Sequence, residues 1–342
     1  MKNKFCLGLS LLFLTLFFTS CEPENNTGSY NNGIFVINEG AFGNSNAEVS
    51  FIHSDNAVNN NLYGANNNSA ILGDVLQSMH IVGDNAYLVV NNSNKIEVVD
   101  IKNFQNKTTL TNFVLPRFMV SSGGTGYVTE YVNFGINGNV KVIDLSSNTV
   151  TDTIQVGIEP ENMLLVGNKL LVANSGDTTV HIINTTNYTK TNIGDIDRPK
   201  YITKTNDGNI WILFTGNPSW APSPSNGGFL VLNSDATSII KTVSLPGNPN
   251  QLTTDGDYLF YELNGNVYKM DKGSTMAPAS SFIVNPSTYL YGLSYYSAGN
   301  VLLIGDAGTF SSSGTVERYN ASTGAYIDDY NVGVAPSGFV FN

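Results

Sequence analysis

Pairs of short apolar segments, separated by a polar turn, recur along the chain. Residues 89–100 consist of an apolar segment, a turn rich in asparagine, and a second apolar segment that ends in an acidic residue. Residues 171–184 have the same pattern. Apolar segments of this length between turn residues are typical of β-strands. Related pairs occur at residues 34–53, 127–144, 210–233, 259–271 and 301–320. Seven similar units predict a repeat architecture.

A third apolar segment precedes most of these pairs, and a proline usually marks its start. The marked positions are 39 to 50 residues apart, which is the spacing of four-stranded propeller blades. The strands are apolar on both faces, as expected for sheets that are packed between neighbouring sheets. The positions are Leu76, Pro116, Pro160, Pro199, Pro249, Leu290 and Pro336.

The last of these segments predicts how the repeats close into a ring. Residues 335–342 have no strand pair after them, whereas the pair at 34–53 has no such segment before it. The C-terminal segment is therefore expected to complete the first blade, which also covers sheet edges that would otherwise be free to pair. The sequence predicts an all-β, seven-bladed β-propeller over residues 33–342.

The N-terminus has the pattern of a targeting segment. Lys2 and Lys4 precede an apolar run at residues 7–18 that is too short to span a bilayer. The run ends in Phe-Thr-Ser-Cys, which resembles the cleavage box of a lipoprotein signal peptide. We expect a signal peptide at residues 1–20, a lipid on Cys21 and a polar tether at 21–32. An ordinary secretory signal is the alternative.

Composition and charge narrow the classes of function. The 342 residues include 27 Asp and Glu against 16 Lys and Arg, which argues against a nucleic-acid partner. Hydrophobic residues make up 41% of the chain, so it is not disordered. Cys6 would leave with the signal peptide and Cys21 would carry lipid, so no disulfide, thiolate metal site or cysteine nucleophile is expected.

No established catalytic motif is present. The chain lacks Gly-x-Ser-x-Gly, a Walker loop and His-Glu-x-x-His. The three histidines, His53, His80 and His181, occupy strand positions of the repeat and are expected to be structural. We therefore expect a protein that binds rather than catalyses, with no cofactor.

Two sets of polar residues recur at fixed positions of the repeat. In an up-and-down blade, the entry into the first strand and the turn between strands two and three lie at the same end. Both sets should therefore surround the mouth of the central channel. The residues of the first set stand at the end of the second strand, where the requirements of the turn alone could explain polar residues. They are Asn38, Asn91, Glu130, Asn174, Thr215, Glu262 and Asp306. The second follows the marked position and is more varied: Gln77, Arg117, Glu161, Lys200, Asn250, Tyr291 and Ser337.

Long loops are expected at the same end. The turn between strands two and three expands to residues 131–139, 216–228 and 307–314, and it places Tyr131 and Trp220 in loops. Trp220 could instead cap a neighbouring blade. Tyr201 adds an aromatic ring beside Lys200. A calcium ion is a further possibility, because Glu39, Glu130, Glu161, Glu262 and Asp306 could supply oxygen ligands.

The repeats resemble those of a known group of propellers. Tyr-Val-Thr-Glu at residues 127–130 and the unit at 171–184 resemble the Tyr-Val-Thr-Asn repeat of surface-layer and YncE-like propellers. The region from Tyr30 to Asn342, with Val-Ile-Asn-Glu-Gly at 36–40, is similar to propeller lipoproteins displayed by Gram-negative gut bacteria, some of which capture cobalamin beside a TonB-dependent transporter.

This resemblance implies a lipid-anchored protein on the outer membrane, facing the cell exterior, that binds a medium-sized polar ligand. Cobalamin is the ligand it favours, with a TonB-dependent transporter as partner. Arg117 and Lys200 could then meet the phosphate of the ligand. The alternatives are a protein-interaction or adhesion propeller and a propeller hydrolase or lyase.

Overall fold

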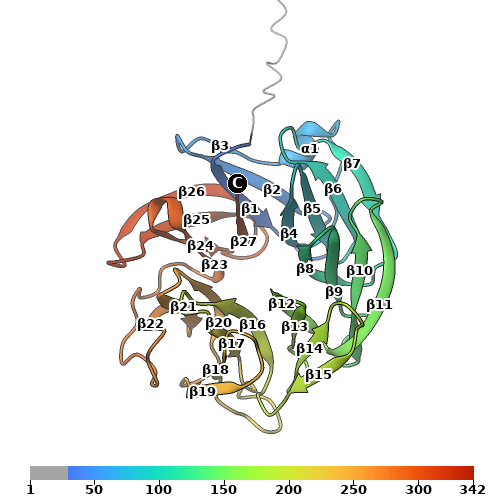
Figure 1. Ribbon diagram of the computed structural model, residues 1–342. Helices are drawn as coiled ribbons and strands as arrows, with labels where there is room; N and C mark the ends of the chain where they lie inside the picture. The colour runs from blue at the N-terminus through green and yellow to red at the C-terminus, as the bar shows by residue number, and fades with distance from the viewer. Residues whose placement is uncertain (1–29) are drawn as a thin grey trace, which may run out of the picture.

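The computed structural model describes residues 30–342 and is an all-β, seven-bladed β-propeller. Seven antiparallel sheets are arranged around a central channel (Figure 1). The signal peptide, Cys21 and all but the last three residues of the tether lie outside the described residues. The predicted fold is confirmed. We number the blades 1 to 7 in chain order.

Each blade runs outward from a strand that lines the channel. From the channel outward, blade 1 consists of β27 (Pro336–Phe341), β1 (Gly33–Asn38), β2 (Glu48–His53) and β3 (Val58–Asn59). Blade 2 consists of β4 (Leu76–Val82), β5 (Asn85–Val90), β6 (Lys95–Asp100) and β7 (Asn106–Leu110). Blade 3 consists of β8 (Pro116–Ser122), β9 (Thr125–Glu130), β10 (Asn137–Asp144) and β11 (Thr149–Ile158).

Blades 4 to 7 repeat this order. Blade 4 consists of β12 (Pro160–Val166), β13 (Lys169–Asn174), β14 (Val180–Asn184) and β15 (Lys190–Ile193), and blade 5 of β16 (Pro199–Lys204), β17 (Ile210–Phe214), β18 (Gly228–Leu232) and β19 (Ile239–Ser244). Blade 6 consists of β20 (Asn250–Thr254), β21 (Tyr258–Leu263) and β22 (Asn266–Asp271). Blade 7 consists of β23 (Leu290–Tyr296), β24 (Val301–Asp306), β25 (Ser313–Asn320) and β26 (Tyr326–Val334).

Blade 6 departs from the four-stranded pattern. Its sheet has three strands, and a single bridge between Val267 and Ile283 stands where an outer strand would be. Two short helices also interrupt the strands, α1 (Leu62–Asn66) and the 3₁₀ helix η1 (Ser297–Gly299). Neither is long enough to leave a helical period in the sequence. No helix within residues 30–342 could cross a membrane.

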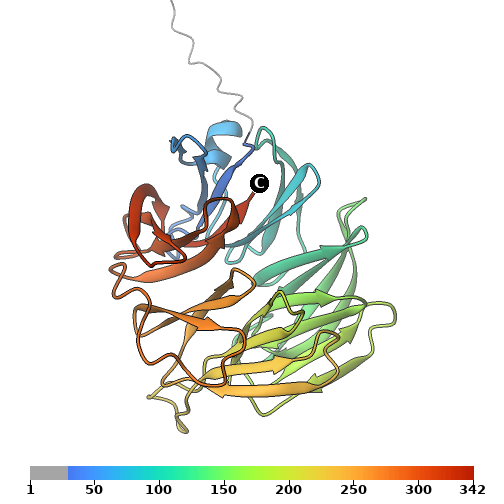
Figure 2. The same ribbon diagram turned by 60° about the vertical axis from the view of Figure 1, so that its left-hand side comes forward.

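The ring closes as the sequence predicts. β27 pairs antiparallel with β1, so that Phe341 lies opposite Ile34 and Phe339 opposite Val36. β27 also adjoins β23 and β4, the inner strands of the two neighbouring blades. The first and last parts of the described chain, blue and red, therefore lie side by side (Figures 1 and 2).

The hydrophobic core is divided into seven clusters that lie between adjacent blades. Between blades 5 and 6, for example, Phe229 packs edge-on against both Trp211 and Tyr261, and all three are fully buried. The middle strands of each blade contribute to a cluster on both faces. This explains why their sequences are apolar at nearly every position.

The inner strands share a backbone irregularity at the end that carries the predicted site. In blade 4, Glu159 has a left-handed conformation (φ 51°), and the pairing register of β12 then shifts between Pro160 and Met163. Bulges of this kind change the direction of a side chain relative to the regular pleat. Five blades have the left-handed residue immediately before the inner strand, at Val75, Leu115, Glu159, Arg198 and Ala335.

A central cavity as the candidate functional site

The bulged ends of the inner strands surround a cavity of about 740 Å³ in the central channel. The residue after the marked position lines this cavity in every blade, as the repeat pattern predicts for the channel mouth. Of the sixteen predicted ligand-binding residues, the structure brings nine together here: Glu39, Gln77, Asn91, Arg117, Glu161, Lys200, Tyr201, Asn250 and Tyr291.

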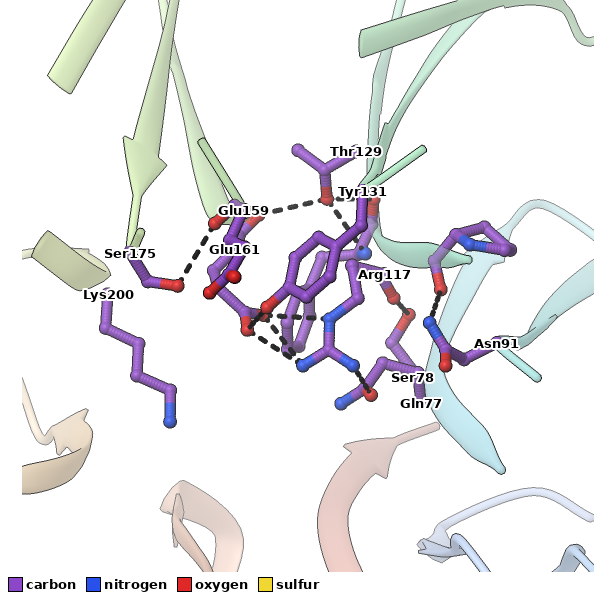
Figure 3. Close-up of polar contacts among 12 residues, drawn as sticks. Gln77, Ser78, Asn91, Arg117, Thr129, Tyr131, Glu159, Glu161, Ser175 and Lys200 are labelled. Atoms are coloured by element: carbon purple, nitrogen blue, oxygen red, sulfur yellow. Dashed lines mark hydrogen bonds and ion pairs between the residues drawn. The ribbon is translucent and has the colours of Figure 1, made fainter. Parts of the chain in front are cut away.

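An ion pair between Arg117 and Glu161 forms one wall of the cavity (Figure 3). The Arg117 guanidinium donates to both carboxylate oxygens, at 2.8 and 3.1 Å from Nη2 and 3.2 Å from Nε. Tyr131 donates its hydroxyl to the same carboxylate, and its ring lies 4.7 Å from the guanidinium. Burial alone would lower the pKa of Arg117, but Glu161 raises it above its usual value. Arg117 therefore remains charged and paired.

The hydrogen-bonded wall continues from Arg117 to blades 2, 1 and 7. Arg117 donates to Gln77 Oε1, and Gln77 Nε2 donates to Glu39 Oε1 at 3.3 Å. Tyr291 donates its hydroxyl to Glu39 Oε2 at 2.6 Å. Burial raises the pKa of Glu39 above its ordinary value, although the bond from Tyr291 opposes this. Side chains from different blades thus hold one another in fixed positions.

Lys200 contributes a different kind of charge to the cavity. Its ammonium group donates to Asn250 Oδ1 at 3.2 Å and lies 5.5 Å from the ring of Tyr201. Figure 3 shows it standing apart from the Arg117–Glu161 pair. Burial lowers the pKa of Lys200. No carboxylate within residues 30–342 forms an ion pair with it.

Aromatic side chains surround the cavity mouth. Phe42 and Phe134 both line the cavity, yet they are 79% and 69% exposed. Phe310 packs edge-on against Tyr291, with ring centroids 4.8 Å apart. The site therefore combines fixed polar groups in the wall with apolar surface at the rim, which is the usual composition of a small-molecule site.

The first set of repeat residues, which ends the second strands, lies mostly outside this cavity. Their side chains bond to nearby backbone and turn groups. Asn174 Oδ1 accepts from the Gly157 N–H at 3.1 Å, and Glu262 accepts from the Gly265 N–H at 2.7 Å. Asp306 accepts from the backbone of residues 288 and 289. Turn chemistry accounts for these positions.

Two further members of this set, Asn38 and Glu130, are buried. Asn38 Nδ2 donates to Ser50 Oγ at 2.8 Å. Glu130 accepts from the Val114 N–H at 2.9 Å and pairs with Lys141. Asn91 is the member that lines the cavity, where it also donates to the Pro116 carbonyl at 3.0 Å.

The remaining predicted residues occupy other positions. Tyr131 lines a smaller cavity next to the central one, and Trp220 is 82% exposed in its loop. Within residues 30–342, no group of three or more His, Cys, Asp or Glu side chains could hold a metal ion. Of the five acidic residues considered for calcium, Glu39 and Glu161 line the central cavity and the other three do not. His80 bonds to Ser121, at 2.9 Å, and does not line the cavity.

Several cavity residues were not predicted from the sequence. Four of them, Ser78, Phe118, Asn162 and Gln251, directly follow a predicted residue in the sequence. The bulge brings two consecutive side chains to the cavity, which simple strand alternation does not predict. Phe310 lies in the expanded turn at residues 307–314, and the length of this turn was the only feature of the sequence that pointed to it.

Comparisons with known proteins agree with the fold. The family described as "Domain of unknown function (DUF5074)" matches residues 32–342. No curated protein matches the sequence. A quinonprotein alcohol dehydrogenase-like protein from Bacteroides thetaiotaomicron is similar in structure, with a TM-score of 0.71 and 15% identity over 92% of this chain and 79% of that one.

Two lactonase-like propellers are also similar. A putative 6-phosphogluconolactonase from Bacteroides fragilis has a TM-score of 0.67 and 14% identity over 91% of this chain and 98% of that one. A periplasmic gluconolactonase from Pseudomonas aeruginosa has a TM-score of 0.67 and 12% identity over 90% and 98%. At these identities the likeness establishes the propeller fold.

Proposed function

The chain belongs to the DUF5074 family, and we propose that this member is a binding protein that captures a medium-sized polar ligand in its central cavity. The observation that carries the proposal is the cavity itself. Its volume of about 740 Å³ lies within the usual range for small-molecule sites. Its polar groups are fixed by bonds between blades, so little ordering is needed when a ligand binds.

Among ligands, we propose a corrinoid such as cobalamin, which the sequence resemblance favours. A corrinoid is broader than the cavity, so one edge would enter while the rest lies against the rim. Amide arms at that edge would meet Gln77, Asn250 and Gln251, and the flat ring system would lie against Phe42 and Phe134. Capture would precede transfer to a TonB-dependent outer-membrane transporter, without chemical turnover.

A lipid anchor on Cys21 would leave the cavity accessible. β1 runs from Gly33 to Asn38, and the cavity residues Glu39 and Phe42 follow its far end. The chain therefore enters the propeller at the end of the blade opposite to those residues. With the anchor on that side, the mouth would face away from the outer membrane and toward the cell exterior.

Calorimetry with purified protein tests the ligand. We expect cobalamin or cobinamide to bind, and Tyr291→Ala to weaken binding by about 1–3 kcal/mol, because it removes an aromatic wall and the hydroxyl that positions Glu39. Tyr326→Ala is the matched control, since Tyr326 is 54% exposed on an outer strand. Absence of heat with both corrinoids, from folded protein, would exclude this ligand class.

A protein-binding role is the second candidate. Phe42, Phe134 and Trp220 are strongly exposed in the loops between second and third strands, and exposed aromatic residues are common in protein interfaces. Alanine at Phe42 and Phe134 would then abolish partner binding, whereas Tyr291→Ala, deeper in the cavity, would leave it unchanged.

A further inference from the structure

A second cavity of about 310 Å³ adjoins the central one and is lined by residues of blades 3 to 6. Glu161, Lys200 and Asn250 line both cavities, so the two are continuous. Arg198 lines only the smaller cavity, and the sequence pattern did not mark it. It precedes the inner strand of blade 5, one residue before the proline.

The backbone of Arg198 is fixed while its side chain is unpaired. Arg198 has a left-handed conformation (φ 60°), and its carbonyl accepts from the Thr215 N–H at 3.0 Å. Within residues 30–342, its guanidinium takes part in none of the seven ion pairs and donates no hydrogen bond to protein. A half-buried guanidinium with five free donors is expected to bind an acceptor.

Lys200, two residues further along, is in a similar state. Its ammonium group makes one bond, to Asn250, which leaves two of its three donors free. Burial lowers its pKa, the carboxylate of Glu161 opposes this, and the positive charges of Arg117 and Arg198 add to it. Two cations without a carboxylate partner thus face the same cavity.

The carboxylates near this cavity are bonded elsewhere. Glu161 is neutralised by Arg117 and bonded by Tyr131. Glu159 lines the cavity and accepts from the Gly135 N–H at 3.2 Å. Asp197, next to Arg198, accepts from Ser225 Oγ at 2.6 Å. None of these carboxylates forms an ion pair with Arg198 or Lys200.

We infer that the smaller cavity is a phosphate subsite, in which Arg198 and Lys200 bind a phosphate group of the ligand that occupies the central cavity. The planar fork of arginine matches two phosphate oxygens, and lysine supplies a compact second charge. A phosphomonoester, which carries up to two charges, balances both cations, whereas a carboxylate or the phosphodiester of cobalamin carries one charge and leaves one cation unbalanced. This inference rests on the proposed binding role and assigns to its ligand an anionic group.

Inorganic phosphate at low ionic strength is the direct probe, because it requires no knowledge of the whole ligand. We expect phosphate to bind in calorimetry and to raise the melting temperature. Arg198→Gln and Lys200→Gln should each weaken phosphate binding about tenfold or more, the effect of losing one charge-assisted hydrogen bond. Lys204→Gln is the matched control: it removes the same charge from an exposed position on β16.

The outcomes separate this inference from the proposed function. Phosphate binding that depends on Arg198 and Lys200, without corrinoid binding, supports the subsite and rejects the corrinoid. Equal weakening by Lys204→Gln would mean diffuse charge attraction and would overturn the subsite. Acetate that binds as tightly as phosphate would overturn the phosphate assignment.

The melting temperatures of the two variants, measured without phosphate, are a second readout. Removal of either cation relieves repulsion between like charges, so Arg198→Gln and Lys200→Gln should be at least as stable as the unaltered protein. A marked loss of stability in both variants would instead indicate structural cations and contradict the inference.

Discussion

Charged residues in the channel wall differ in whether the protein itself satisfies them. Arg117 and Lys200 occupy the same position of the repeat, and both line the central cavity. Arg117 has a carboxylate partner from the next blade, whereas Lys200 has only a neutral amide. Position in the repeat therefore decides where a side chain points. Its neighbours decide whether it holds the ring together or remains free to bind.

The Arg117–Glu161 pair should stabilise the contact between blades 3 and 4. The Glu161 side chain is only 4% exposed, so Arg117→Met would leave a buried carboxylate without its cation. We expect a loss of about 3 kcal/mol in the free energy of unfolding, measured by urea denaturation. Adding Glu161→Gln should recover part of this loss. Equal stability of the single and double variants would argue against a buried-charge effect.

At the scale of the elements, the blades meet through contacts between glycine and proline. Gly138, Gly227 and Gly314 stand at or just before the start of the third strand in blades 3, 5 and 7. A Cβ at each would lie 2.5 Å from Cδ of the proline at the next blade's inner strand. The marked prolines thus have a packing role between blades as well as a role at strand entry.

Gly314→Ala tests this contact. Its new methyl group would meet both Pro336 Cδ and the Asp306 carbonyl at 2.5 Å, and neither atom can move freely. We expect a loss of about 1–3 kcal/mol, as for other overpacked sites. Gly194→Ala is the control, because nothing lies within 4 Å of its added methyl group. Similar unfolding midpoints for the two variants would contradict the steric argument.

The regular repeat made the strands predictable from the sequence. The site was less predictable, because its contacts join distant residues and because individual blades depart from the repeat. Spacing of prolines and apolar pairs was sufficient to assign the inner strands, because every blade meets the same packing demand. The bonding of Glu39 to Tyr291 joins residues 252 positions apart, which no local pattern encodes. Blade 6 is a further case: its left-handed residue is Gln251, inside the strand rather than before it.

At the scale of the whole molecule, stability depends on closure. Each hydrophobic cluster lies between two blades, so a blade at an open end would expose one apolar face. β27 both completes the sheet of blade 1 and adjoins the inner strands β23 and β4. The C-terminal strand is therefore the joint between the two ends of the ring.

Deletion of residues 335–342 should consequently cost far more than an ordinary terminal truncation. It removes every backbone bond between β27 and β1 and uncovers Ile34 and Val36, which are buried in the cluster between blades 1 and 7. We expect loss of the single cooperative transition in thermal unfolding, rather than fraying of one strand. Deletion of Asn342 alone, which removes only the bonds of this residue to Gly33 and Tyr30, is the control and should cost far less. A truncated protein that melts cooperatively at an unchanged temperature would show that the ring does not need this strand to close.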